Sequence, residues 1–327
     1  MDIYAVAGAD GAGKTATALN VAVAFRADGQ YAAVLDADVS ENVADLLDTE
    51  PEHTLDDVFD GDATIREATI EYELAPENVP EDDLLAYREA LADDRRQFRS
   101  GEQDLAGTDE TAFPDVDTIP VIAGWPSERR LAATDPDELE SVLQELVMAY
   151  DAIVIDTGGE SVAATAPVGV ADGVAVVTSP DESHVRTSNG TAIECQRNGA
   201  RLIGTVVNRA DERTTVTAIT DEVGVEGVGT IPADERTPAL EPVRYSVPDA
   251  PAAKAYDRLA ESLAEWSRAV EAEADSAADG GGPGASSAQA APDGESTDAG
   301  TGGEEGGTES GDDDDGGGGL LGRFGLD

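Results

Sequence analysis

Cysteine, aromatic residues and long apolar runs are scarce in this chain of 327 residues, and each scarcity excludes a class of structure. The single cysteine, Cys195, excludes an intrachain disulfide and any paired-cysteine metal site. No stretch approaches the roughly 18 consecutive apolar residues that a membrane-spanning helix needs. The N-terminus begins with a strand-like segment and not with a signal peptide. We therefore expect a cytoplasmic protein that contacts a membrane at most from its surface.

Positive charge is also scarce. The chain has 20 basic and 70 acidic residues, which gives a formal net charge of −50. Direct binding of duplex DNA is not expected, because the DNA phosphates would be repelled. Residues 271–319 hold 14 of the acids and no base, so most of the excess acid is spread over the rest of the chain. Such spread acidity is typical of halophilic proteins, which work in concentrated salt that screens charge repulsion.

One of the only two lysines stands in a phosphate-binding motif. Residues 8–15 read GADGAGKT, which matches Gly-x-x-x-x-Gly-Lys-Thr, and they directly follow the apolar run 3–7. Glycines let such a loop turn its N–H groups onto a phosphate, and the helix that begins near Lys14 adds its positive end. Lys14 would reach the β- and γ-phosphates of a nucleotide, and the Thr15 hydroxyl would ligate Mg²⁺. The loop residues expected at the nucleotide are Gly8, Asp10, Gly11, Ala12, Gly13, Lys14 and Thr15.

Short apolar segments alternate with helical patterns, at residues 3–7, 32–36, 119–123, 152–156, 174–178, 202–208 and 228–231. This alternation predicts an α/β fold, in which a doubly wound, mostly parallel sheet carries helices on both faces. The clearest helix is predicted at 136–150, with Asp135 as its N-cap and Pro136 in its first turn. Ligands of such sheets bind beyond the carboxyl ends of the strands, so polar residues at those ends are candidates for chemistry.

Polar residues end three of the predicted strands. One strand ends in Asp36-Ala37-Asp38, and another ends at Asp156. Mg²⁺ keeps most of its waters and accepts one or two protein carboxylates, so we expect Asp36 and Asp156 near the metal. Asp38 is the candidate to orient an attacking water. Asn208 ends a third strand, and its amide can pair with the donor and acceptor edges of adenine, although an ordinary turn asparagine is the alternative.

Taken together, these motifs resemble the MinD/ParA family of spatial-positioning ATPases. The chain has the phosphate loop, the Asp-x-Asp strand end, residues 150–157 (YDAIVIDT) and residues 178–186 (TSPDESHVR) in the family's order. Residues 204–209 (GTVVNR) resemble the family's adenine-reading strand, and residues 231–234 (IPAD) resemble its C-terminal signature. The resemblance covers residues 1 to about 265, apart from an insertion. It implies ATP and Mg²⁺ as cofactors, a homodimer that forms on ATP binding, slow hydrolysis, and a protein partner that recognises the dimer.

The resemblance places Pro232 and Asp234 at the nucleotide, and it also makes three departures informative. The family has a second lysine near the start of the loop, which reaches the partner subunit's phosphates, where this chain has Ala9. The absence of this lysine implies slower hydrolysis, or a dimer held by other contacts. Asp10 adds a carboxylate to the loop, and we expect it to point away from the nucleotide. Residues 158–160 read GGE where the family usually has a proline, which predicts a more mobile switch.

Two other functions stay open. The loop is similar to that of thymidylate kinases, and residues 94–96 (DRR) echo their Asp-Arg motif, although the later motifs have no reason to occur in such a kinase. A scaffold that binds nucleotide without turnover is the second alternative, and Ala9 favours it. We interpret the chain first as an ATPase that positions a partner complex, in cell division, motility or a polar assembly.

Three regions follow from composition. A nucleotide-binding domain is expected at 1–270, with a charged insertion at about 76–117 that is either a partner-binding arm or a solvated excursion. Residues 271–319 lack large apolar side chains, which predicts a disordered acidic linker. Residues 320–327 (LLGRFGLD) resemble a minimal form of the C-terminal helix that anchors MinD relatives at the inner face of the membrane. Docking on a protein, or no function, are the alternatives for this segment. The apolar residues that would make the contact are Leu320, Leu321, Phe324 and Leu326.

Deletion of residues 320–327 tests the membrane contact. We expect the truncated protein to lose cosedimentation with anionic liposomes in the presence of ATP, because the apolar side chains that would enter the lipid are gone. A matched variant with Leu320→Ser and Phe324→Ser should behave like the deletion. Liposome binding that is unchanged in both variants would contradict a membrane role.

Overall fold

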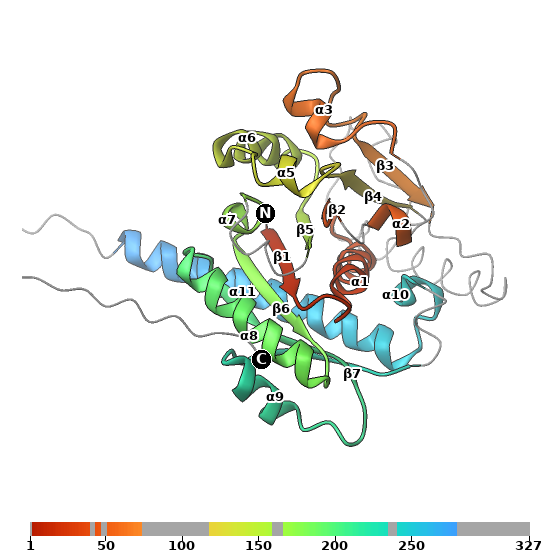
Figure 1. Ribbon diagram of the computed structural model, residues 1–327, viewed down its shortest axis with the longest axis vertical. Coiled ribbons are helices and arrows are strands. Elements are labelled where there is room, and N and C mark those ends of the chain that lie inside the picture. Colours follow the sequence, from red (N-terminus) through yellow and green to blue (C-terminus); the bar gives the residue numbers. More distant parts are fainter. Residues whose placement is uncertain are drawn as a thin grey trace, which may run out of the picture. The chain divides into compact units, whose positions relative to one another are not determined.

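The computed structural model in Figure 1 describes residues 2–39, 43–46, 51–73, 118–158, 166–234 and 241–279. Five sequence predictions lie wholly or partly outside these ranges: the insertion at 76–117, the kinase-like residues 94–96, the switch residues 159–160, the acidic linker from residue 280 to 319, and the terminal segment 320–327. They stay predictions.

A sheet with the strand order β3-β4-β2-β5-β1-β6-β7-β8 forms the centre of the fold. All of its strands except β3 run parallel to their neighbours, and each of these parallel strands was predicted from the sequence. The predicted α/β, doubly wound, mostly parallel fold is therefore confirmed. The parallel strands are β1 (Asp2–Gly8), β2 (Ala32–Ala37), β4 (Thr118–Ala123), β5 (Ala152–Thr157), β6 (Gly173–Thr178), β7 (Leu202–Ala210) and β8 (Gly227–Pro232).

The remaining strand, β3 (Thr69–Glu73), was not predicted. It pairs antiparallel with β4 at one edge of the sheet. Its sequence, Thr-Ile-Glu-Tyr-Glu, has only two large apolar residues, so it lacks the continuous apolar run that identifies the central strands. The glutamates suit an edge strand, because charge there discourages pairing with another chain.

Helices connect the strands and cover both faces of the sheet (Figure 1). The predicted helix at 136–150 is confirmed as α6, which ends three residues earlier, and Asp135 caps it by accepting a hydrogen bond from the Asp137 N–H at 3.0 Å. The helices are α1 (Lys14–Ala27), α2 (Val43–Leu46), α3 (Leu55–Phe59), α5 (Glu128–Leu131), α6 (Pro136–Val147), α7 (Ala166–Val170), α8 (Glu182–Arg197), α9 (Val216–Val223), α10 (Val243–Ser246) and α11 (Pro251–Asp279).

Helix α11 corrects one detail of the sequence analysis. It runs to Asp279, so residues 271–279 are helical, although their composition placed them in a disordered linker. Alanine and glutamate dominate this stretch, and both residues favour helix when a packed helix precedes them. The prediction for residues 280–319 is unaffected.

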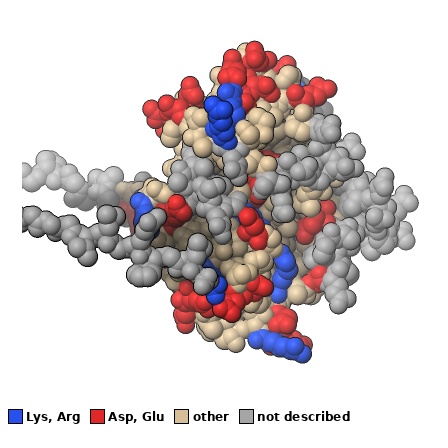
Figure 2. Space-filling view, viewed as in Figure 1, with Lys and Arg blue, Asp and Glu red and all other residues tan. Residues whose placement is uncertain are grey.

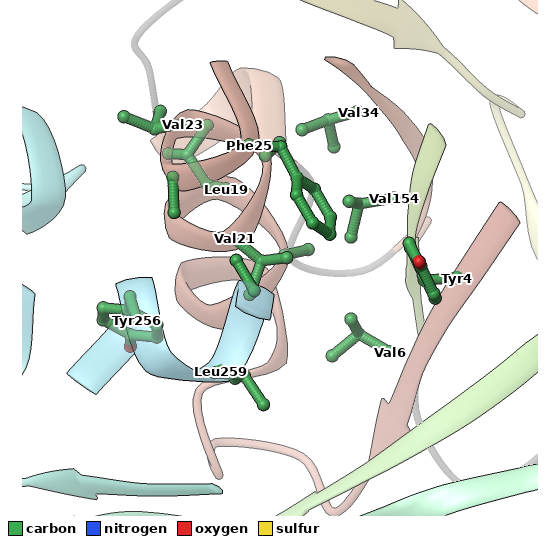
Figure 3. Close-up of a cluster of buried hydrophobic side chains, with 14 of the residues drawn as sticks. Tyr4, Val6, Leu19, Val21, Val23, Phe25, Val34, Val154, Tyr256 and Leu259 are labelled. Atoms are coloured by element: carbon green, nitrogen blue, oxygen red, sulfur yellow. The ribbon is translucent and has the colours of Figure 1, made fainter. Parts of the chain in front are cut away.

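The core lies on both faces of the sheet, because alternate side chains of each strand point to opposite sides. On one face, Tyr4 and Val6 of β1 pack with α1 and α11 (Figure 3). On the other face, Ile3 and Ala5 of β1 pack with α6 and with Cys195 of α8. Helices α1 and α11 therefore cover the same face of the sheet, where α11 packs against both α1 and β8. Of the 14 residues of α1, 11 are buried. A helix that is buried all round is held rigidly, and α1 is the helix that follows the phosphate loop.

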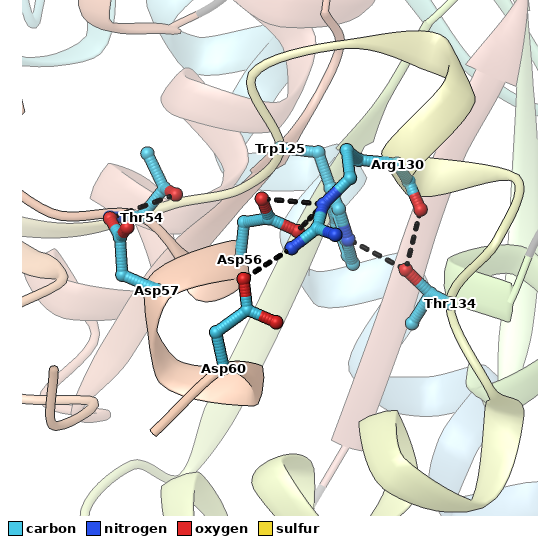
Figure 4. A network of polar contacts seen from close by, with 7 residues as sticks. All are labelled: Thr54, Asp56, Asp57, Asp60, Trp125, Arg130 and Thr134. Carbon is cyan, nitrogen blue, oxygen red and sulfur yellow. Dashed lines mark hydrogen bonds and ion pairs between the residues drawn. The ribbon is translucent and has the colours of Figure 1, made fainter. Parts of the chain in front are cut away.

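A polar network joins the segments that follow β2 and β4 (Figure 4). The Arg130 guanidinium donates to the Asp56 carboxylate at 2.5 and 2.7 Å and to the Asp60 carboxylate at 2.6 Å. Beside it, the Trp125 indole N–H donates to the Thr134 hydroxyl at 2.7 Å. This network fixes the chain beyond the carboxyl ends of two strands that border the candidate site.

Acidic side chains cover much of the face shown in Figure 2, and basic side chains occur there only as separate spots. This distribution fits the acidity that the sequence spreads along the chain. In the described part of the chain, no helix is both long enough and apolar enough to cross a membrane.

Replacing Phe25 by alanine tests the anchoring of α1. The Phe25 ring is 1% exposed and stacks on Tyr4 with ring centroids 5.5 Å apart, so we expect the free energy of unfolding to fall by about 3–5 kcal/mol. Denaturant unfolding in molar KCl would measure this loss. Met148→Ala is the control, because the Met148 side chain is 88% exposed. Equal effects of the two substitutions would contradict the packing described here.

Candidate nucleotide-binding site

Glycines shape the loop between β1 and α1. Gly8, Gly11 and Gly13 have φ values of 142°, 68° and 96°, which other residues rarely adopt. A Cβ added at Gly8 would lie 2.0 Å from the Val177 carbonyl oxygen, and one at Gly13 would lie 2.2 Å from Asn208 Nδ2. The loop is thus packed against β6 and β7, and its end leads directly into the first turn of α1. A helix start of this kind is a suitable site for an anion.

The loop lysine is buried and already paired. Lys14 is 5% exposed, and its Nζ lies 3.2 Å from Asp10 Oδ1 and 3.5 Å from the Ala9 carbonyl oxygen. The Asp10 side chain is 67% exposed, so its carboxylate reaches the lysine from the solvent side. We expected this carboxylate to point away from the nucleotide. In the structure it is paired with Lys14, the lysine that the motif assigns to the phosphates, from a turn that precedes α1. Its direction relative to a bound nucleotide stays a prediction.

Asp156 is the most unusual acid of the site. In the sheet it pairs with Asp36 of β2 and with Val6 of β1, so it lies in the centre of the sheet at its carboxyl edge. It is fully buried, and among the described residues the Thr15 hydroxyl is its nearby donor, although neither carboxylate oxygen has a hydrogen bond of ordinary geometry. Burial raises the pKa of Asp156 well above its usual value, and the Asp36 and Asp38 carboxylates raise it further. The nearby Thr15 and Lys14 lower this pKa only in part.

A buried carboxylate without partners is costly unless a cation compensates it. Thr15, in the first turn of α1, lies close enough to Asp156 to affect its pKa. A hydroxyl and one carboxylate beside a phosphate loop fit Mg²⁺, which completes its coordination with phosphate oxygens and water. In the described residues no group of three or more His, Cys, Asp or Glu side chains could hold a metal ion by itself.

Asp36 lies at the end of β2 and Asp38 just after it, and both are buried. Asp36 accepts hydrogen bonds from the Asp38 N–H at 3.3 Å and from the Val43 N–H at 2.8 Å, so its carboxylate ties the start of α2 to the end of β2. Gly124 packs against the backbone of the same strand end, since a Cβ there would lie 1.7 Å from the Asp36 carbonyl oxygen. The structure gives Asp36 a structural role that the sequence analysis missed. Its metal role, and the role of Asp38 toward water, stay predictions.

Asn208 lies near the end of β7, two residues before its last residue, and holds the loop. Its Nδ2 donates to the Ala12 carbonyl oxygen at 2.9 Å, and its Oδ1 accepts from the Arg209 N–H at 2.9 Å. Both ends of the amide are engaged in this structure, so contact with adenine would require a rearrangement and stays a prediction. Arg209 has a φ of 56°, and its guanidinium donates to the Gly11 carbonyl oxygen. The sequence analysis gave Arg209 no role, because the left-handed turn that aims it at the loop leaves no pattern in the sequence.

Residues at the end of β8 lie beside the end of β7. Pro232 pairs with Ala210, and the Ala233 N–H donates to the Ala210 carbonyl oxygen at 2.8 Å. The chain that carries Pro232 and Asp234 therefore lies at the same carboxyl edge as Asn208. Whether these residues contact a nucleotide stays a prediction.

Helix α8 supports the loop from the opposite side. The Ser188 hydroxyl accepts from the Ala9 N–H at 3.3 Å and donates to the Val177 carbonyl oxygen at 2.9 Å. His184 shares a hydrogen bond of 2.7 Å with the Ser179 hydroxyl, and its Nε2 would lie 3.9 Å from a Cβ added at Gly11. These residues lie in and just after the TSPDESH segment, which the sequence analysis used for the family resemblance without giving its side chains a role.

The geometry defines a class of protein. A glycine-rich loop between the first strand and a buried helix, a lysine at the loop's end and an acid at the end of the adjacent strand are the features of a phosphate-loop nucleotide-binding protein. Residues 3–241 match the model of the family described as the CobQ/CobB/MinD/ParA nucleotide binding domain, and the chain belongs to this family. The resemblance drawn from the sequence motifs is thereby confirmed.

Individual relatives agree with this assignment. A protein of Methanocaldococcus jannaschii, described as an uncharacterized ATP-binding protein, is 28% identical over 275 residues, which cover 80% of this chain and 86% of the relative. The cell division ATPase MinD of Pyrococcus furiosus has a similar structure, with a TM-score of 0.57, 23% identity, and 81% and 98% of the two chains covered. The septum site-determining protein MinD of Pyrococcus horikoshii, solved with Mg-ADP, has a TM-score of 0.58, 22% identity, and 80% and 95% coverage.

The substitution Asp156→Asn tests whether the buried carboxylate binds a cation. Because the folded protein raises the pKa of this carboxyl, it binds the proton more tightly than the unfolded chain, and ionisation destabilises the fold as the pH rises. At pH 7 without Mg²⁺, the asparagine variant should therefore have a higher Tm than the wild type, and the difference should shrink toward pH 4. Added MgADP should raise the Tm of the wild type more than that of the variant. An equal response to MgADP would argue against a metal role.

Proposed function

We propose that this protein is a MinD/ParA-type ATPase, whose ATP-dependent dimerisation controls the position of a partner complex in the cell. One observation carries the proposal: the buried Lys14 ends a glycine-rich loop near Asp156, a fully buried carboxylate that Thr15 and Lys14 compensate only in part. A cationic group and a partly compensated acid near one another suit a phosphate with its magnesium ion. Membership of the family and the ATP-binding relative support ATP as the nucleotide.

In this proposal the chain's own groups act in a defined order. The loop N–H groups and the start of α1 hold the phosphates. Lys14 leaves Asp10 and neutralises charge on the β- and γ-phosphates, while Thr15 and Asp156 hold Mg²⁺. That ion would supply positive charge to the same phosphate oxygens. Asp38 orients the attacking water from the end of β2, next to Asp156.

Ala9 affects the expected rate of ATP hydrolysis. Its side chain is buried, and its N–H is bound to the Ser188 hydroxyl, so it offers no group to a second subunit. A cation that would stabilise the developing phosphate charge is therefore missing at this position, which favours slow turnover. A scaffold that binds nucleotide and does not hydrolyse it is the second candidate function, and Ala9 is the observation that favours it.

The proposal also includes a location in the cell and a partner for the protein. We place the protein in the cytoplasm, or peripherally at the inner face of the membrane or at the cell poles. A protein cargo or regulator would recognise the nucleotide-bound dimer, and the segment 320–327 would add contact with lipid or protein. The strong negative charge argues against direct binding of duplex DNA.

The proposal is tested by ATP binding, hydrolysis and dimerisation, measured with Mg²⁺ in molar KCl. We expect Lys14→Ala to weaken ATP binding at least about tenfold and to abolish dimerisation, because it removes the charge-assisted contact with the phosphates. Asp38→Ala should still bind ATP and form dimers in light scattering, but its turnover should fall about 100-fold, the size of effect typical for a residue in proton transfer.

Lys254→Ala is a matched control, because it removes the chain's other lysine, which pairs with Asp249 at 3.2 Å on the surface. It should leave all three measurements unchanged. ATP binding and dimer formation without turnover in the wild type would identify the scaffold as the function. A wild type that binds no nucleotide would contradict both candidates.

A further inference from the structure

The start of the phosphate loop lacks the net positive charge that favours binding of a polyphosphate. Ala9 contributes no charge, and Asp10 places a carboxylate 3.2 Å from Lys14 Nζ. The ion pair leaves this part of the loop with no net charge. Lys14 is almost fully buried, so its attraction to a nearby carboxylate is less screened by solvent than that of a surface pair.

The two terminal phosphates depend on different parts of the loop. The β-phosphate is bound mainly by backbone N–H groups at the start of α1, which the Asp10 carboxylate does not occupy. The γ-phosphate has no such cradle and relies on Lys14, which reaches between the two phosphates. A carboxylate on that lysine therefore competes with the γ-phosphate more than with the β-phosphate.

Two other nitrogen-bearing side chains near the loop are engaged elsewhere. The Arg209 guanidinium, from β7, donates to the Gly11 carbonyl oxygen, and the His184 ring, from α8, is hydrogen-bonded to Ser179. Lys14 is thus the cation that Asp10 engages directly in the described part of the chain, and its charge is shared between Asp10 and any bound phosphate.

We propose that Asp10 is a specificity-determining residue that shifts the preference of this site toward nucleoside diphosphates and away from triphosphates, by competing with the γ-phosphate for Lys14. The inference rests on the proposed function, since it assumes that nucleotide binds at this loop. It adds that the diphosphate-bound protein is the resting form. Concentrated salt weakens the competition, because the exposed Asp10 carboxylate is screened.

Isothermal titration of MgADP and of Mg²⁺ with a non-hydrolysable ATP analogue, into wild type and Asp10→Asn, tests this inference. We expect Asp10→Asn to bind the triphosphate analogue about tenfold more tightly and MgADP less than about threefold more tightly, as for the loss of one charge repulsion next to a single phosphate. The gain should shrink between 0.5 and 3 M KCl. Asp10→Ser is a second variant, which guards against an effect specific to asparagine.

Asp221→Asn is the matched control, an exposed acid on α9, and it should change neither affinity. An equal gain for both nucleotides in the Asp10 variants would overturn the inference, since it would show that Asp10 only sets the shape of the loop. Unchanged affinities would overturn it as well. If neither the wild type nor any variant binds either nucleotide, the proposed function itself fails, and the inference fails with it.

Discussion

The packing of α1 against the sheet, with α11 beside it on the same face, is the constraint on which the candidate site depends. A phosphate loop binds its ligand through backbone groups, so its ability to bind depends on how firmly its two ends are held. Strand β1 fixes one end in the middle of the sheet, and α1 fixes the other. Ser188 and Asn208 then hold the loop by hydrogen bonds to its backbone, Ser188 at the Ala9 N–H and Asn208 at the Ala12 carbonyl oxygen. The loop is thereby shaped before any ligand arrives, which reduces the ordering cost of binding.

The candidate site contains a buried acid and a lysine that is paired with another acid. Asp156 is buried at the carboxyl edge of the sheet with an elevated pKa, and Lys14 is held by Asp10. Asp156 would gain from a nearby cation, and Lys14 would exchange its ion pair with Asp10 for a contact with a phosphate. This arrangement explains how a chain with a net charge of −50 could bind a polyanion: the site depends on one lysine and on helix N–H groups, and not on an overall positive field.

The fold was largely readable from the sequence, because buried parallel strands are continuous apolar runs. The edge strand β3 was missed, since a short strand with one face toward solvent has no such run. Asp156 and the loop could be placed from strand ends and glycine spacing. The contact of Asp10 with Lys14, the left-handed turn at Arg209 and the backbone role of Asp36 could not, because each depends on local geometry that side-chain patterns do not encode. The prediction of a disordered linker at 271–279 was wrong, because the composition of this stretch is compatible with both a linker and an extended helix.

Hydrogen exchange of the backbone amides, followed with and without MgADP in molar KCl, tests the central claim most directly. The account predicts new protection concentrated in residues 11–15 and in the first turn of α1, with smaller effects at the ends of β2 and β5. That pattern should depend on Mg²⁺ and should be lost in Lys14→Ala. Protection that is absent, or that lies away from the loop, would contradict a nucleotide site at this position.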